Sequence, residues 1–341
     1  MNFEVVRPKT LCNRLVVVDG LPGCGKTMLS AVISSLERVE LFKYSYEIEV
    51  QCILHHFKKA DIDTSASLIQ YHLDLIIYNQ MMARETNFRY SDLSSVFKSV
   101  DKLKYFKRLF GPGDEKVPDI IEKQKPIVHL VTHCLSAYSN PLLDNFNNEM
   151  LLINFHRNPL YMLKQNMWNM KNLLNSGRDF NLYFDWNKKK LPYYFHSQEE
   201  KMLKANHLEK SIFFLEWSRK NALNNQLQNY GRHYYELTFE SFVGNPFPHL
   251  EEIEKRLGSK KTNFTSRILK REKIPRNLLS LGRDMPIYRR VNWEKTSARS
   301  PNQEIDDLYD WAISEISINA KESLDWLLED YNKIVNRLEN K

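Results

Sequence analysis

Residues 15–29 of the chain have the sequence LVVVDGLPGCGKTML. The segment from Leu15 to Asp19 is a β-branched apolar run typical of a buried parallel strand, and a helical pattern begins at Lys26. Between them, Gly20 to Thr27 match the Walker A pattern GxxxxGK(S/T) at every position. In such a loop the glycines let N–H groups face inward, the helix N-terminus adds partial positive charge, and the lysine supplies a point charge. The stretch therefore predicts a strand, a loop and a helix that bind the phosphates of a nucleotide.

Four further apolar runs predict strands at residues 41–46, 127–131, 151–155 and 233–237. Helical patterns separate them, and strands that alternate with helices form parallel sheets with helices on both faces. We therefore predict an α/β fold of three α/β/α layers around a central parallel sheet, as in P-loop NTPases. A helical insertion is expected at about 50–110 and a helical C-terminal part at about 262–341. Because no repeat or linker interrupts the sequence, one domain of residues 1–341 is expected.

The charge balance favours a small anionic ligand. The chain has 49 Lys and Arg against 42 Asp and Glu, a formal net charge of +7. These basic residues form short, scattered groups without a zinc-finger or RNP-type motif, so we expect a polyanionic cofactor rather than a nucleic acid. The four cysteines lack metal-ligand spacing, which predicts buried thiols and no metal site. No run of about 18 uncharged apolar residues and no signal-peptide pattern is present, so we expect no membrane span and a cytoplasmic location.

Neither of the predicted strands at 127–131 and 151–155 ends in an acidic residue. Nucleotide-hydrolysing P-loop proteins normally hold magnesium with a carboxylate at the end of a neighbouring strand. Here Thr132 and His133 follow one strand, and His156 and Arg157 follow the next. This pattern weighs against hydrolysis of a nucleoside triphosphate. Two alternatives stay open: a small-molecule kinase that uses ATP and magnesium, and a catalytically silent nucleotide-binding module.

Three segments, in order and spacing, resemble the cytosolic sulfotransferases. They are PIVHLVTH at 126–133, LLINFHRNP at 151–159 and YELTFESFVGNP at 235–246. In that family one strand ends in Thr-His and the next in Arg-Asn-Pro. Further along, Arg289 and Arg290 ahead of Trp293, with the sequence DDLY at 306–309, are similar to the family's C-terminal basic motif and closing helix.

The resemblance implies transfer of a sulfuryl group from 3′-phosphoadenosine-5′-phosphosulfate (PAPS) to a hydroxyl or amine. The acceptor would be a small molecule, a carbohydrate or another compound with such a group, and a homodimer is left open. His133 would be the general base, since an imidazole titrates near neutral pH, and Lys26 would act beside it. The residues implied for the cofactor are Gly20, Pro22, Gly23, Cys24, Gly25, Lys26, Thr27 and Met28 around the 5′-phosphosulfate, and Arg157, Gln165, Arg289 and Arg290 around the 3′-phosphate.

Structural interpretations of the same residues remain beside these. His133 either acts as a base or only bonds a loop, while His129, two residues earlier, is expected to be structural. The aromatic stretch at 183–195 either lines an acceptor pocket or forms a packed helical layer, and we favour packing. Glu240 is expected to be a structural acid near a helix start.

Overall fold

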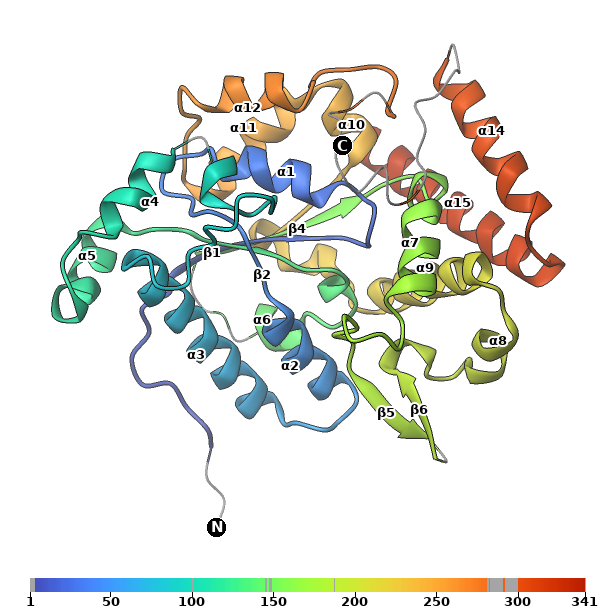
Figure 1. Ribbon diagram of the computed structural model, residues 1–341, viewed down its shortest axis with the longest axis horizontal. Helices are drawn as coiled ribbons and strands as arrows, with labels where there is room; N and C mark the ends of the chain where they lie inside the picture. Colours follow the sequence, from blue (N-terminus) through green and yellow to red (C-terminus); the bar gives the residue numbers. More distant parts are fainter. Residues whose placement is uncertain are drawn as a thin grey trace.

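The computed structural model describes residues 4–99, 101–144, 146, 149–186, 188–280, 282, 291 and 300–340. Within these residues, five strands form one parallel sheet in the order β2-β3-β1-β4-β7 (Figure 1). The strands are β1 (Arg14–Asp19), β2 (Lys43–Tyr44), β3 (Val128–Val131), β4 (Glu149–His156) and β7 (Tyr234–Thr238). Helices lie on both sides of the sheet, which confirms the predicted three-layer α/β fold.

The central strand is buried on both faces. Leu15, Val16, Val17 and Val18 of β1 expose no surface. In a parallel sheet covered by helices on each side, both side-chain directions meet apolar neighbours, so such a strand shows no polar alternation. Full burial of each of these side chains stabilises the fold by roughly 1.5–3 kcal/mol relative to exposure. The apolar run therefore forms the centre of the core and holds the start of the glycine loop.

In Figure 1, α1, α11 and α12 lie on one side of the sheet, and α2, α3 and α6 lie on the other. Helices make up most of the described residues of the predicted insertion and of the predicted C-terminal part, as expected. The described α-helices are α1 (Lys26–Ile33), α2 (Tyr46–His56), α3 (Ile62–Met81), α4 (Lys102–Arg108), α5 (Val117–Gln124), α6 (Asn140–Leu143), α7 (Leu160–Asn172), α8 (Glu199–Lys204), α9 (His207–Asn224), α10 (Phe239–Gly244), α11 (Pro246–Leu257), α12 (Thr265–Arg271), α14 (Pro301–Ser314) and α15 (Ile318–Glu339).

The strand predicted at 41–46 is much shorter in the structure. Only Lys43 and Tyr44 pair with β3, because α2 begins at Tyr46. β4 extends beyond its predicted bounds at both ends, and β7 begins one residue later than predicted.

The aromatic stretch at 183–195 does not form a helical layer. Its first part is an antiparallel hairpin of β5 (Tyr183–Trp186) and β6 (Lys189–Pro192), followed by a 3₁₀ turn at Tyr193–Phe195. Tyr, Phe and Trp favour pleated, half-buried strands, which explains the hairpin. The expectation of packing holds for the three residues of the turn, which are buried.

All four cysteines are buried free thiols, as predicted. No helix in the described part of the chain is long and apolar enough to cross a bilayer.

Candidate functional site

A cleft with a volume of about 750 Å³ opens at the carboxyl edge of the sheet. Ligands of open α/β folds bind at this edge, because the loops after the parallel strands meet there. The cleft brings together most of the predicted site residues, namely Pro22, Gly23, Gly25, Lys26, Thr27, Met28, His133, Arg157 and Gln165. Gly20 and Cys24 instead line a smaller neighbouring cavity. Arg289 and Arg290 lie outside the described residues.

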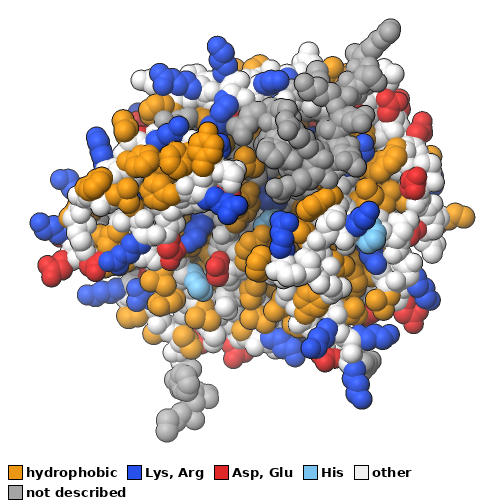
Figure 2. Space-filling view, in the orientation of Figure 1, with side chains coloured by type: hydrophobic (Ala, Val, Ile, Leu, Met, Phe, Trp, Pro, Cys, Tyr) orange, Lys and Arg blue, Asp and Glu red, His pale blue; other side chains and the backbone are white. Residues whose placement is uncertain are grey.

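Figure 2 shows Lys and Arg side chains scattered over the visible face among hydrophobic ones, without one continuous basic track.

The glycine loop is folded into a compact cup around Lys26. The Lys26 ammonium donates a hydrogen bond to the carbonyl oxygen of Gly20 at 2.8 Å, and the residue is only 6% exposed. Gly25 has a φ of +94°, a conformation that side chains rarely adopt, and a Cβ there would lie 2.5 Å from the ring of Phe239. The loop backbone and the Lys26 ammonium thus lie together at the start of α1.

Two side chains that follow the neighbouring strand β4 hold this loop. The Asn166 amide of α7 donates to the carbonyl oxygen of Pro22 at 2.7 Å, and the Arg157 guanidinium donates to that of Gly23 at 2.9 Å. The sequence interpretation missed Asn166. No motif marks it, and its only signal is its place on the helix that follows Arg157.

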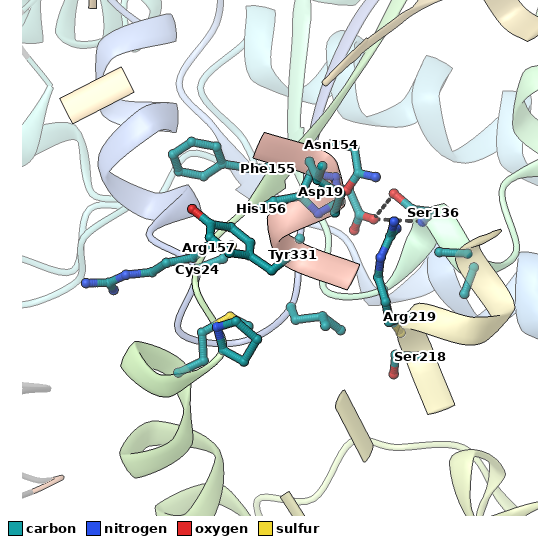
Figure 3. A pocket seen from close by; sticks show the side chains of 18 of the residues that line it. Asp19, Cys24, Ser136, Asn154, Phe155, His156, Arg157, Ser218, Arg219 and Tyr331 are labelled. Atoms are coloured by element: carbon teal, nitrogen blue, oxygen red, sulfur yellow. Dashed lines mark hydrogen bonds between the residues drawn. The ribbon is translucent and has the colours of Figure 1, made fainter. Parts of the chain in front are cut away.

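The Arg157 guanidinium lies between two aromatic rings, 4.1 Å from the centre of Phe239 and 4.9 Å from that of Tyr161. Its Nε is buried and finds no hydrogen-bond partner among the described residues. Figure 3 shows this side chain extending from the end of β4 with its guanidinium directed away from Tyr331. A buried donor without an acceptor is costly, so this group is suited to an anionic ligand.

Arg276 is a second cation that the sequence interpretation missed. It lines the cleft, and its guanidinium lies 5.5 Å from the ring of Phe239, which Arg157 also contacts. It donates to the carbonyl oxygen of Glu272 at 3.0 Å. Two arginines thus share one aromatic ring at the cleft wall.

His133 lies at the end of β3, held by a carboxylate and two tyrosines. Its backbone N–H donates to Glu49 Oε1, and its ring Nδ1 lies 3.4 Å from Glu49 Oε2. The rings of Tyr44 and Tyr46 stack on the imidazole, with centroids 5.9 and 5.2 Å away and interplanar angles of 17° and 18°. Glu49 was missed because it lies just before the helical pattern recognised from Val50. The imidazole therefore has a fixed plane within the cleft.

Tyr44 connects this histidine to the phosphate loop. Its hydroxyl lies 2.9 Å from Thr27 Oγ1, at hydrogen-bond distance, while its ring stacks on His133. Burial raises the pKa of the Tyr44 hydroxyl, so the group stays protonated at neutral pH.

Asp19, the acid at the end of β1, is fully engaged by protein donors. Its carboxylate accepts four hydrogen bonds, from Thr132 Oγ1, the Leu135 N–H, and the N–H and hydroxyl of Ser136. Figure 3 shows the pair formed with Ser136. These bonds tie the loop that carries His133 to the strand that begins the glycine loop.

Two other residues behave as structural groups. Glu240 is partly buried and accepts hydrogen bonds from the Asn158 N–H at 3.1 Å and from the Tyr331 hydroxyl at 2.6 Å, and desolvation of the carboxyl raises its pKa. His129 is fully buried beside Ser34 Oγ at 3.0 Å, and burial lowers its pKa to about 3. The imidazole of His129 is therefore neutral and is packed beneath the site.

A small cavity of about 60 Å³ adjoins the cleft behind the glycine loop. Arg219 and Asp330 pair beside it at 2.5 Å. Nearby, His156 Nε2 lies 2.8 Å from Glu236. Although burial alone would raise the pKa of Glu236, His156 and two arginines outweigh it and lower the pKa to about 2. These contacts account for the charged groups around the cavity as structural ion pairs.

No protein-family model and no curated protein sequence matches the chain. Solved structures that are similar to the chain include the following three. The sulfotransferase domain from the curacin biosynthetic pathway is 10% identical, with a TM-score of 0.47 over 94% of this chain and 97% of that one. The sulfotransferase domain of the Synechococcus PCC 7002 olefin synthase is 11% identical, with a TM-score of 0.45 over 97% and 98%. Mouse sulfotransferase SULT7A1, solved with PAP, is 10% identical, with a TM-score of 0.33 over 92% and 89%. All three of these structures are described as sulfotransferases.

Proposed function

We propose that this protein transfers a sulfuryl group from PAPS to a hydroxyl or amine acceptor. The observation that carries the proposal is one cleft lined by an anion-binding loop, by Lys26 and by a held histidine, His133. The ends of β3 and β4 offer no carboxylate for magnesium, and Asp19 is occupied by four protein donors. This set of groups suits transfer of an anionic group without a metal.

The residues of the cleft fit the proposed donor. The amides of the glycine loop and the Lys26 ammonium would suit its 5′-phosphosulfate. Arg157, with its buried and unpartnered Nε, would bind the 3′-phosphate, assisted by Gln165 on the same wall. When bound, the donor supplies an electrophilic sulfur and a phosphate leaving group.

Each residue then has one task. His133 takes the proton of the acceptor as the acceptor oxygen or nitrogen attacks, and Lys26 balances the charge that develops on the leaving oxygen. Tyr193 and Tyr194 line the same cleft and would contact the acceptor. General-base assistance of this kind contributes about 10²–10⁴-fold to a rate.

The second candidate is a small-molecule kinase, favoured by Lys26 and Thr27 at the positions that hold phosphate and magnesium in ATP-dependent enzymes. It requires a carboxylate free to hold the metal, which the engaged Asp19 does not provide. A catalytically silent nucleotide-binding module is the third reading. It predicts nucleotide binding without transfer.

Calorimetric titration separates these functions. We expect adenosine 3′,5′-bisphosphate to bind at least about tenfold more tightly than ADP, without magnesium, since a charged pair is worth about 1.5–3 kcal/mol. Arg157→Lys keeps one charge but loses the planar fork, so it should remove most of that preference. Tighter binding of ATP with magnesium supports the kinase instead. Sulfuryl transfer from labelled PAPS that His133→Ala abolishes, with bisphosphate binding intact, excludes the silent module.

A further inference from the structure

Glu49 contacts His133 at two points. Its Oε1 accepts the backbone N–H of His133, and its Oε2 lies 3.4 Å from the ring Nδ1. The carboxylate side chain is 9% exposed, against 26% for the imidazole. A buried carboxylate is costly unless hydrogen-bonded, and this one meets its partner in the site itself.

The ring of His133 has little freedom to turn away. Tyr44 and Tyr46 stack on it nearly parallel, and Tyr44 is itself at hydrogen-bond distance from Thr27. The imidazole plane is therefore set, and Nδ1 is the ring nitrogen that meets the carboxylate. No described residue makes a hydrogen bond to Nε2, and the side chain is exposed to the cleft.

We propose that Glu49 is the positioning residue for His133: it holds the proton on Nδ1, so that Nε2 carries the lone pair. When Nε2 accepts a proton from the acceptor group, Nδ1 keeps its own, and the ionised carboxylate stabilises the resulting imidazolium. The distance of 3.4 Å is long for an N–H···O bond, and such contacts shorten once the ring is charged. The effect of Glu49 on catalysis rests on the proposed function, whereas its effect on the tautomer of His133 does not.

The tautomer is tested on the resting full-length protein. In ¹⁵N-histidine-labelled protein, the two ring nitrogens of His133, assigned from the His133→Gln spectrum, should show a proton on Nδ1. Glu49→Ala and Glu49→Gln should move the proton distribution toward Nε2–H. Glu47→Gln changes an exposed acid two residues earlier on α2 and should leave the spectrum unchanged. A His133 signal that is identical in the wild type and both Glu49 variants overturns the proposal.

The kinetic test separates positioning from a purely structural role. We expect Glu49→Ala to lower kcat by about 100-fold, and Glu49→Gln, which keeps a neutral acceptor, by about tenfold. The donor KM should stay within about twofold, because Glu49 does not contact the phosphate loop. If Glu49→Ala does not fold, the shape-conserving Glu49→Gln decides. A kcat equal to that of Glu47→Gln overturns the proposal.

The two proposals fail in different ways. If the wild type transfers no sulfuryl group but the tautomer follows Glu49, the proposed function is wrong and the positioning role stands. If the wild type is active, and the Glu49 variants change neither the tautomer of His133 nor kcat, the positioning role is wrong and the proposed function stands. If Glu49→Ala and His133→Ala are both inactive but the tautomer does not change, Glu49 acts as a base itself and the proposal falls.

Discussion

Asp19→Ala should strongly destabilise the fold at the carboxyl edge of the sheet. The substitution removes the acceptor of four hydrogen bonds, two of which come from the backbone N–H groups of Leu135 and Ser136. Both residues are buried, at 1% and 5% exposed, so water cannot replace the carboxylate without opening the loop. Each buried N–H group left without an acceptor costs about 1–3 kcal/mol. The expected loss is therefore roughly 2–6 kcal/mol.

Urea unfolding at pH 7, followed by circular dichroism, measures this loss. Thr132→Val deletes one hydroxyl donor of the same cluster and is expected to cost about 1.5–3 kcal/mol, since the acceptor is charged. Asp307→Ala removes an exposed acid on α14 and should stay within about 0.5 kcal/mol of the wild type.

The decisive result is the order of the three variants in how much free energy of unfolding they lose. If Asp19→Ala is less destabilising than Thr132→Val, the carboxylate does not organise the loop, and the account of how His133 is held to the glycine loop fails. A loss close to that of Asp307→Ala has the same meaning.

Two further predictions concern Gly25 in the glycine loop and the buried carboxyl of Glu40. Gly25→Ala places a Cβ 2.5 Å from an aromatic ring at a φ of +94°. It should therefore lower the free energy of unfolding by roughly 2–6 kcal/mol and abolish bisphosphate binding in calorimetry. Gly113→Ala, which has open space around it, should have neither effect. Burial alone would raise the pKa of Glu40, but its basic partners on α4 outweigh it and lower the pKa to about 2. Because the folded-state pKa is below the unfolded one, Glu40 contributes stability above about pH 4.5 that is lost as the pH falls toward 2. Unfolding free energies measured from pH 7 to pH 2.5 should therefore fall less steeply for Glu40→Gln, and equal slopes contradict this.

The glycine loop was predictable because its sequence signal is local. A strand, three glycines at positive φ and a lysine at the helix start follow one another within Leu15 to Lys26, so no distant contact is needed to define them. The alternation of strands and helices likewise gave the sheet and its layers. The strand at 41–46 was overestimated because periodicity alone does not reveal that α2 begins at Tyr46.

The supports of the site were not predictable in the same way. Glu49, Asn166 and Arg276 come from separate segments, and each reaches the site only after the sheet has assembled. Glu49 and His133 are separated by 84 positions, and nothing in either local sequence pairs them. The hairpin at 183–192 was missed for another reason, since short aromatic runs fit both strand and helix until their pairing is known.

The topology of the sheet explains why a phosphate loop and a histidine meet in this chain. β1 and β3 are direct neighbours in parallel register, with Val18 opposite Val131, so the residues that follow the two strands emerge side by side. Asp19 then bonds the turn after β3, and Tyr44 on β2 spans from Thr27 to His133. Asp19 and Tyr44 therefore link the glycine loop to the segment that carries His133. Under the proposed function, this linkage would couple occupancy of the loop to the orientation of His133.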